Sequence, residues 1–238
     1  MILLGIDTET TGLKVATASI VEIGMVLWDT DLHSPVKLLG NLVDPGPDAA
    51  WEPGASESNG LSYEICAKYG ITEAAALKQV ISWFDKADTV VAHNGFGFDF
   101  PLLEHWAKRH NLPLPSKFRI DTKCDLEISS RNSTRLIYMA ADHGFLNPFS
   151  HRAVFDALTM LKILDCYNID QVVETAKSPV LTIRALVSYN DREKAKARGY
   201  HWQAESKMWT MIVRERYLER ERAAAREVGF DIEVISEE

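Results

Sequence analysis

The chain has 238 residues and a mass of 26.8 kDa, which is enough for one well-packed core and a small additional unit. Hydrophobic residues make up 46% and charged residues 25%, ordinary values for a globular protein that exclude a mostly disordered chain. No apolar run is long enough to predict a transmembrane helix, and the N-terminus lacks the basic start of a signal peptide. The three cysteines, Cys66, Cys124 and Cys166, are far apart, which argues against a disulfide scaffold and favours a reducing cytoplasm.

The net charge of −8 is unevenly distributed along the chain. Residues 1–175 carry 14 basic and 23 acidic side chains, whereas residues 176–238 carry 12 basic and 11 acidic side chains. An acidic body is not what simple attraction to phosphate groups requires. It is compatible with a site that collects carboxylates around divalent cations, because the cations reverse the local field.

The first part of the chain predicts three strands and then helices that alternate with two further strands. Apolar runs predict strands at 2–6, 20–28, 36–43, 89–92 and 118–124. Apolar residues at helical spacing predict helices at 73–86, 99–110, 134–143 and 151–166. The segment 44–61 is rich in Pro, Gly, Ser and Asn, which predicts a surface loop near the site. This order favours a mixed α/β fold, in which helices cover one sheet that starts as an antiparallel meander.

The composition changes at Ser178-Pro179, where a second unit begins. The pattern there predicts strands at 181–189, 207–213 and 230–235 and helices at 191–199 and 214–229. We therefore predict two domains: residues 1–176, and a small α+β accessory domain of residues 180–238.

Five residues of the first domain stand out by type and placement. Asp7 and Glu9 lie two apart at the end of the first strand, so both side chains point to the same face. Asp99 follows a strand and a Gly-containing turn, and His151 and Asp156 share the segment HRAVFDA. An i, i+5 pair can share a helix edge only if His151 is at the start of the helix. Each residue alone has an ordinary explanation as a turn, cap or surface residue, but acids at the ends of apolar strands together require a partner or a metal.

The segments IDTETTGL, HNGFGFDFPLL and HRAVFDA resemble, in this order, the three motifs of the DnaQ-like, or DEDD, 3′–5′ exonuclease family. The segment VEIGMV after the first motif also fits, and the His-x-x-x-x-Asp spacing resembles the histidine branch of the family. The resemblance covers roughly residues 2–166. It implies a ribonuclease-H-like fold, a five-stranded mixed sheet flanked by helices.

The resemblance also implies a mechanism with two divalent cations, Mg²⁺ or Mn²⁺, about 3.5–4 Å apart, which suit oxygen ligands and clamp the attacking and leaving oxygens. Asp7 is then expected to bridge both metals, Glu9 and Asp156 to complete the ligands of the first, and Asp99 to serve the second. His151, with a pKa near neutrality, is expected to accept a proton from the attacking water as general base.

The resemblance further implies that the backbone around Thr8 and Thr10 lies near the terminal nucleotide. Asn94, Phe98 and Tyr69 are also expected near the substrate. In many members of the family a His-Gly-Ile-Thr segment lies between the first two motifs, whereas this chain has Tyr69-Gly70-Ile71-Thr72. Tyr69 is therefore either a platform for a base or a packed aromatic. For His93 and Asn94, hydrogen bonding at the strand end is the alternative to substrate contact.

The C-terminal part combines basic and aromatic residues. Between Arg184 and Arg226 there are 11 basic and 6 acidic residues, interleaved with Tyr200, Trp202 and Trp209. Aromatic and cationic side chains together suit single-stranded nucleic acid, but the two tryptophans can equally form a small core. The Arg- and Glu-rich stretch 214–227 is typical of an ion-paired, solvated helix. We expect this unit to hold substrate or a partner and to carry out no chemistry.

The sequence thus predicts a metal-dependent 3′–5′ exonuclease that releases nucleoside 5′-monophosphates, from DNA rather than RNA, with single-stranded or frayed ends preferred. The alternatives are a 3′–5′ exoribonuclease on the same scaffold and a non-catalytic nucleic-acid-binding or polymerase-associated subunit. The complete set of five residues argues against the non-catalytic alternative. We expect a cytoplasmic protein with no membrane partner and with a possible polymerase, replication or repair partner; the sequence does not indicate an oligomeric state.

Overall fold

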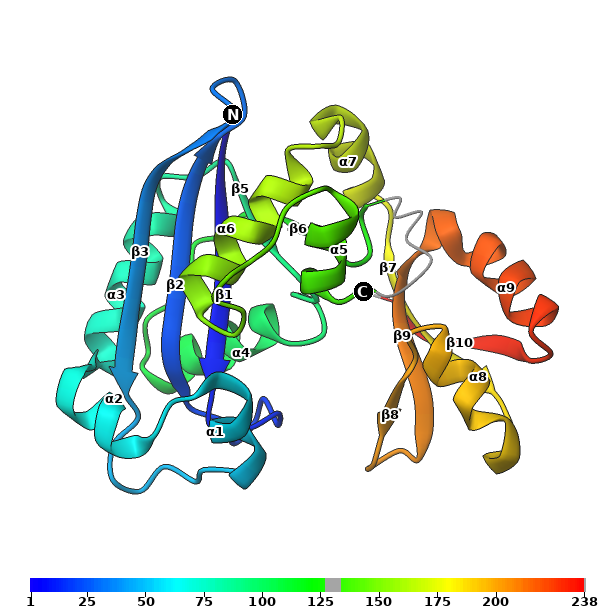
Figure 1. Ribbon diagram of the computed structural model, residues 1–238, viewed down its shortest axis with the longest axis horizontal. Helices are drawn as coiled ribbons and strands as arrows, with labels where there is room; N and C mark the ends of the chain where they lie inside the picture. The colour runs from blue at the N-terminus through cyan, green and yellow to red at the C-terminus, as the bar shows by residue number, and fades with distance from the viewer. Residues whose placement is uncertain (127–133, 238) are drawn as a thin grey trace.

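The structure is a computed structural model that describes residues 1–126 and 134–237, in which two sheets are visible (Figure 1). The larger sheet has the strand order β4-β3-β2-β1-β5-β6. Its strands are β1 (Ile2–Thr10), β2 (Ile20–Asp29), β3 (Ser34–Asp44), β4 (Ile71–Thr72), β5 (Thr89–Ala92) and β6 (Phe118–Asp121). The first three form the expected antiparallel meander, and β5 and β6 run parallel to β1. The mixed sheet is therefore confirmed, with the two-residue β4 added to the five expected strands because so short a strand has no periodicity to detect.

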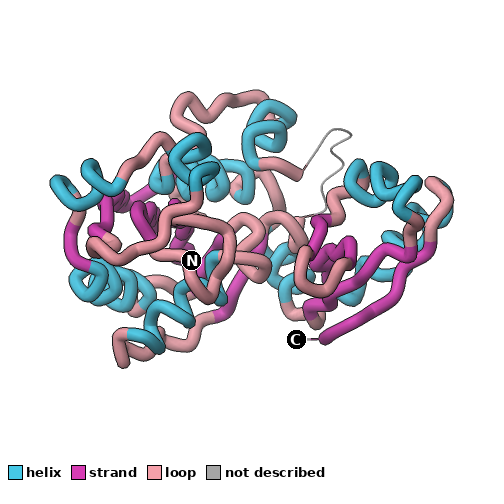
Figure 2. Tube along the Cα trace, turned by 90° about the horizontal axis from the view of Figure 1, so that it is seen from below, coloured by secondary structure: helices cyan, strands magenta, loops and turns pink. Residues whose placement is uncertain are grey.

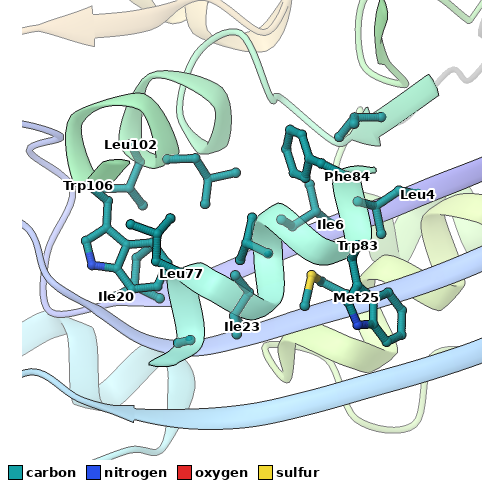
Figure 3. Close-up of a cluster of buried hydrophobic side chains, with 14 of the residues drawn as sticks. Leu4, Ile6, Ile20, Ile23, Met25, Leu77, Trp83, Phe84, Leu102 and Trp106 are labelled. Carbon is teal, nitrogen blue, oxygen red and sulfur yellow. The ribbon is translucent and has the colours of Figure 1, made fainter. Parts of the chain in front are cut away.

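Helices cover both faces of this sheet. They are α1 (Pro53–Asn59), α2 (Tyr63–Tyr69), α3 (Glu73–Phe84), α4 (Asp99–Arg109), α5 (Leu136–Asp142), α6 (Ala153–Leu164) and α7 (Ile169–Ala176). On β1, Leu4 and Ile6 pack against α3 and α4 (Figure 3), whereas Leu3 packs against α6 on the other face. Because strand residues alternate between faces, the odd-numbered positions of β1 face α6. None of the helices in the described ranges is long and apolar enough to cross a bilayer.

Gly24 on β2 lets α6 approach the sheet closely. It pairs across the ladder with Asp7, and a Cβ atom built at Gly24 would lie 2.0 Å from the backbone of Ala153. A side chain at this position would therefore push the helix away. The glycine brings the beginning of α6 directly over the part of β1 that carries the first motif.

Several boundaries differ from the expected ones. The strand β1 continues to Thr10 because it pairs with β2 as far as Ile20, and β6 ends at Asp121, whose carboxylate accepts the N–H of Lys123 in the following turn. The expected loop 44–61 contains α1, which is stopped by Gly60 in a left-handed conformation. Two further helices, α2 and α7, lie where no element was predicted.

Residues 180–237, called here the C-terminal unit, contain the second sheet, with the order β10-β7-β9-β8. Figure 2 shows the strands of this unit in magenta beside its helices in cyan. Its elements are β7 (Val180–Leu186), η1 (Tyr189–Asp191), α8 (Arg192–Ala197), β8 (His201–Gln203), β9 (Met208–Arg214), η2 (Glu215–Tyr217), α9 (Leu218–Glu227) and β10 (Asp231–Glu237). It has a core of its own, in which Tyr200 is buried and Trp209 is partly buried, but Trp202 is 50% exposed. The two tryptophans therefore differ: Trp209 packs against this core and Trp202 does not.

Candidate active site

The carboxylates of the first motif lie on β1, the strand between β2 and β5. Asp7 and Glu9 are within the strand rather than after it, and both face α6. Thr8 lies between them and faces the opposite side, toward α4, where its hydroxyl contacts Asp99. One strand thus presents acids to one helix and an anchoring hydroxyl to another.

Asp99 is the first residue of α4 and approaches β1 from the face opposite to α6. It is 4% exposed, and its Oδ1 accepts a hydrogen bond of 2.7 Å from Thr8 Oγ1. The loop before it is held by Asp121, whose two carboxylate oxygens accept the backbone N–H groups of Asn94 and Phe96 at 2.8 and 3.1 Å. The acid of the second motif is therefore fixed beside the first motif.

The third motif lies in the turn before α6. His151 has a φ of +63°, and the helix begins two residues later, at Ala153, rather than at residue 151 as expected. The N–H of His151 donates to Asp156 Oδ2 at 2.9 Å, and Asn147 Nδ2 donates to Asp156 Oδ1 at 2.5 Å. The left-handed turn, and not a shared helix edge, is what brings the two residues of the i, i+5 pair together.

The first and third motifs converge in space. Glu9, His151 and Asp156 each offer one oxygen or nitrogen atom, and these atoms all lie within 4.8 Å of one another. Asp7 and Asp99 lie close to this group, since the charges of Asp99, Asp156 and Glu9 all raise the pKa of Asp7, and the charge of Asp99 also raises the pKa of Glu9. The fold therefore brings together all five residues that the sequence singled out.

The acids of this cluster destabilise one another's charged forms. Burial raises the pKa of Asp7 well above its ordinary value, and the charges of Asp99, Asp156 and Glu9 raise it further. Burial, followed by the charges of Asp156 and Glu22, raises the pKa of Glu9 to about 8. Burial likewise raises the pKa of Asp99 to about 7 and shifts that of Asp156 upward. Carboxylates with such pKa values would be held in their ionised form by cations bound between them.

Glu22, on β2 directly opposite Glu9, is a buried acid to which the sequence analysis gave no role. Arg152 donates to it from Nη2 to Oε1 at 2.9 Å and from Nε to Oε2 and Oε1 at 3.0 and 3.2 Å. The N–H of Ala153 also donates to Glu22 Oε2, at 3.3 Å. Glu22 therefore anchors the start of α6, and an acid inside an otherwise apolar strand is a sequence signal that could have predicted such a role.

Asn59 and Asn147 are further residues that sequence reasoning missed. Asn59, at the end of α1, donates from Nδ2 to the carbonyl of Thr10 at 3.2 Å, and its hydrogen bond to Glu9 partly opposes the rise in that pKa. Asn147 holds Asp156 from the loop before the third motif. Neither residue belongs to a hydrophobic pattern or a charged pair, so only the folded chain reveals its role.

The two threonines of the first motif use their hydroxyl groups within the protein. Thr8 Oγ1 donates to Asp99, and Thr10 Oγ1 donates to the carbonyl of Gly12 at 2.7 Å. Both side chains are buried. A substrate contact here would come from the backbone of this segment, as the resemblance implies, and not from the hydroxyl groups.

The loop between β5 and α4 is held by internal hydrogen bonds. His93 donates from Nε2 to the carbonyl of Thr134 at 2.8 Å, and its Nδ1 lies 2.9 Å from Thr122 Oγ1. Burial lowers the pKa of His93 to about 4, so its ring is neutral. Asn94, with a φ of +64°, accepts a hydrogen bond of 2.9 Å from Lys123 Nζ. His93 and Asn94 thus make hydrogen bonds within the protein, as predicted by the alternative to substrate contact.

Phe98 and Tyr69 have different surroundings. Phe98 immediately precedes Asp99 and packs, partly buried, against the core on the α4 side of the sheet. Tyr69 ends α2 and is 66% exposed, with the ammonium group of Lys68 5.0 Å from its ring centroid. Its exposure excludes the packed-aromatic explanation and leaves its ring accessible.

Comparison with known proteins identifies the family. The model of the RNase T exonuclease family matches residues 4–164. Among curated proteins, an oligoribonuclease of Leifsonia xyli subsp. xyli is 29% identical over 182 residues, which cover 70% of this chain and 82% of that protein. Three prime repair exonuclease 2 of Mus musculus is 31% identical over 156 residues, which cover 58% of this chain and 63% of that protein.

Solved structures share the fold at low identity. E. coli Exonuclease I in complex with a dA16 oligonucleotide superposes with a TM-score of 0.64 at 17% identity, covering 79% of this chain. The zinc-bound form of an E. coli Exonuclease I complex with single-stranded DNA gives a TM-score of 0.65 at the same identity. This chain spans 48% of the length of each of those chains. The match over two thirds of the sequence, together with the three motifs, shows that the chain belongs to the exonuclease family of the DnaQ-like, or DEDD, type.

Proposed function

We propose that this protein is a 3′–5′ exonuclease that hydrolyses the terminal phosphodiester bond of DNA and releases nucleoside 5′-monophosphates. A free 3′ end must reach the carboxylates, so unpaired or frayed ends are the expected substrates. Residues 1–176 would form the exonuclease domain and residues 180–238 an accessory domain. The observation that carries the proposal is the convergence of Glu9, His151 and Asp156 within 4.8 Å, beside Asp7 and Asp99.

The donors at this site suit two small, hard cations. Carboxylate oxygens are the ligands preferred by Mg²⁺ and Mn²⁺, and the repulsion that raises the pKa values of these acids would be relieved by bound cations. Asp7 would contact both cations, Glu9 and Asp156 the first, and Asp99 the second. When bound, such cations make a water molecule more acidic and neutralise charge on the scissile phosphate.

His151 is the residue that would move a proton. Its side chain is exposed, and its ring offers a nitrogen beside Glu9 and Asp156. Asp156 accepts the N–H of His151 and thereby fixes the turn that carries the ring. We assign His151 as the general base that accepts a proton from the attacking water. Thr8, Asn147 and Arg152 do not need to touch substrate, since they hold Asp99, Asp156 and Glu22 in place.

A 3′–5′ exoribonuclease is the second candidate, because the relative that matches over most of its length is named an oligoribonuclease. The deciding experiment incubates the full chain with DNA and RNA oligonucleotides of the same sequence, labelled at the 5′ end, in Mg²⁺ or Mn²⁺. A ladder that shortens from the 3′ end, faster on DNA, supports the proposal, and faster shortening of RNA supports the second candidate. No shortening of either strand in either metal would overturn both.

We also propose a cellular location and a class of partner for this protein. Cys66, Cys124 and Cys166 are free thiols, which fits a reducing compartment such as the cytoplasm. An exonuclease that acts on DNA ends would serve replication or repair, and a polymerase or repair protein is the expected class of partner. Fractionation of cells and affinity purification of the full chain would test the location and the partner.

A further inference from the structure

The C-terminal unit contains a groove that the exonuclease chemistry does not use. It has a volume of about 750 Å³ and is lined by the end of β7, the segment around η1 and the hairpin of β8 and β9. This volume is within the range of sites that hold organic ligands. The side chains that define its character are Tyr189, Arg192, Trp202, Lys207 and Trp209.

Aromatic rings in this groove are exposed to solvent. Tyr189 is 77% exposed and Trp202 is 50% exposed. Trp202 lies beside Trp209, with ring centroids 5.7 Å apart, so the core-packed tryptophan supports the exposed one. The guanidinium of Arg192 lies 4.0 Å from the centroid of the Tyr189 ring and supports it in the same way. Flat rings held in place from one side are suited to stacking against nucleobases, and this stacking does not depend on base identity.

The charge of the groove also favours nucleic acid. Arg184, Arg192 and Lys207 line it, and no acidic residue is among its lining residues in the described part of the chain. Arg184 is paired with Glu233, and Arg192 lies 3.7 Å from Glu193, so these two cations are partly neutralised. Lys207 is exposed and has no ion-pair partner within residues 1–126 and 134–237. On a chain with a net charge of −8, this is a local cationic surface that suits phosphate groups.

The hairpin that carries Trp202 and Lys207 also contacts the N-terminal part of the chain. Glu205, at its tip, lies 3.7 Å from Lys14, in the loop that follows β1. His201, at its start, accepts a hydrogen bond of 3.0 Å from Lys123, which also holds Asn94 in the second motif. Figure 1 shows the hairpin extending toward the same end of the molecule as the end of β1. The hairpin therefore lies against the segments that follow β1 and β6, on the side of the larger sheet where the first motif ends.

We propose that the groove is a second nucleic-acid site, which holds the part of a single-stranded substrate that lies 5′ of the scissile bond. Bases stack on Trp202 and Tyr189, and Lys207 contacts a phosphate. This inference rests on the proposed exonuclease function, and it deepens that function by assigning a binding role to the C-terminal unit. It implies that long strands are bound more tightly than very short ones.

The test compares a single-stranded DNA 20-mer with a trinucleotide, using the full chain and the variants Trp202→Ala and Lys207→Ala. Loss of a stacking ring should raise the KM for the 20-mer roughly 5- to 150-fold and leave its kcat and the kinetics on the trinucleotide unchanged. Lys207→Ala should lower the slope of log affinity against log salt by about 0.7, the single-strand value for one phosphate contact. Trp202→Phe should keep most of the affinity because it keeps a flat ring.

Lys86→Ala is the matched control for charge, since Lys86 precedes β5 at the end of the sheet opposite to the carboxylates. It should leave the salt slope unchanged. An unchanged KM and salt slope in Trp202→Ala and Lys207→Ala would overturn the second site, as would an equal rise in KM for the trinucleotide. Binding of the 20-mer in Ca²⁺ is measured in parallel, so that a wild-type protein that binds but does not hydrolyse would contradict the proposed function and not the groove.

Discussion

Arg214 of the C-terminal unit forms a buried, two-point ion pair with Asp125, which follows the last strand of the larger sheet. Arg214 Nη2 lies 2.9 Å from Asp125 Oδ2, and Arg214 Nε contacts Asp125 Oδ1. The residues are 3% and 1% exposed. Asp125 also accepts the N–H of Asp121 at 2.7 Å, and Asp121 in turn holds the loop that precedes Asp99. The C-terminal unit is thus connected by hydrogen bonds to the support of a candidate metal ligand.

Replacing Arg214 by methionine should destabilise the protein by about 3–5 kcal/mol, because Asp125 is left buried with an uncompensated charge. Chemical denaturation measures the change. The double variant Asp125→Asn/Arg214→Met should be less destabilised than the sum of the single variants, since no unpaired charge remains. Arg226→Met, which removes an exposed pair with Asp231, should change stability little. If the losses of stability caused by Asp125→Asn and Arg214→Met simply added up in the double variant, an energetic coupling between the two residues would be contradicted.

Gly24→Ala should disturb α6, because the added methyl group would lie 2.0 Å from the backbone of Ala153. We expect a loss of stability of about 1–3 kcal/mol or more and a fall in kcat, since the start of α6 carries Asp156. Gly54→Ala is the control: a Cβ at this helical position meets no atom within 4 Å, so the substitution should be neutral or slightly stabilising. Wild-type stability and kcat in Gly24→Ala would show that the close approach is unimportant.

Asp7→Asn should abolish hydrolysis and at the same time stabilise the protein in the absence of divalent cations. The loss of a metal ligand should lower kcat by about 10³-fold or more. The melting temperature in EDTA should rise, because one member of a mutually repelling cluster becomes neutral. Asp156→Ala should lose activity in the same way. Asp48→Asn, at an exposed position, is the control and should change neither kcat nor the melting temperature in EDTA. Near-wild-type hydrolysis by Asp7→Asn would exclude the assignment of Asp7 as a metal ligand.

His151→Ala should lose roughly 10²- to 10⁴-fold in kcat, the usual contribution of a general base. Binding of a single strand in Ca²⁺ should be largely retained, because the ring is exposed and is not assigned to holding substrate. His105→Ala, on α4, is the matched histidine control and should behave as the wild type. A variant that turned over normally at saturation but bound poorly would assign His151 to binding instead.

His93 predicts a pH dependence of stability that is separate from catalysis. Burial lowers its pKa from 6.5 to about 4, so the folded protein binds this proton less readily than the unfolded chain does. The free energy of unfolding should therefore fall as the pH drops from about 6.5 toward 4, with a contribution of at most about 1.4 kcal/mol per pH unit.

The acids of the active site titrate in the same range with the opposite sign, because their pKa values are raised, so the difference between the wild type and His93→Gln isolates the histidine. That difference, obtained from denaturation curves between pH 4 and 7, should grow toward neutral pH in favour of the wild type. Parallel stability curves for the two proteins would contradict the role of His93.

Much of the fold follows from patterns that are local in sequence. Apolar runs placed β2, β3 and β5, and helical spacing placed α3 and α4, because the periodicity of buried side chains is the same wherever the element packs. The three motifs likewise predicted acids that the fold brings close together, and their roles as metal ligands stay a proposal. The missed elements α2, β4 and α7 are short, and a short element contains too few residues for its periodicity to be detected.

The sequence by itself singled out the five residues to which we assign the chemistry, and it indicated a mixed sheet covered by helices. Only the tertiary structure decided how they meet: His151 reaches Asp156 through a left-handed turn, and Glu22, opposite Glu9, fixes the start of α6 through Arg152. The reason is physical. The side on which a residue faces is set by the period of its own strand or helix, but the distance between two motifs is set by strand register, close packing and long-range hydrogen bonds, and none of these is a property of a single segment.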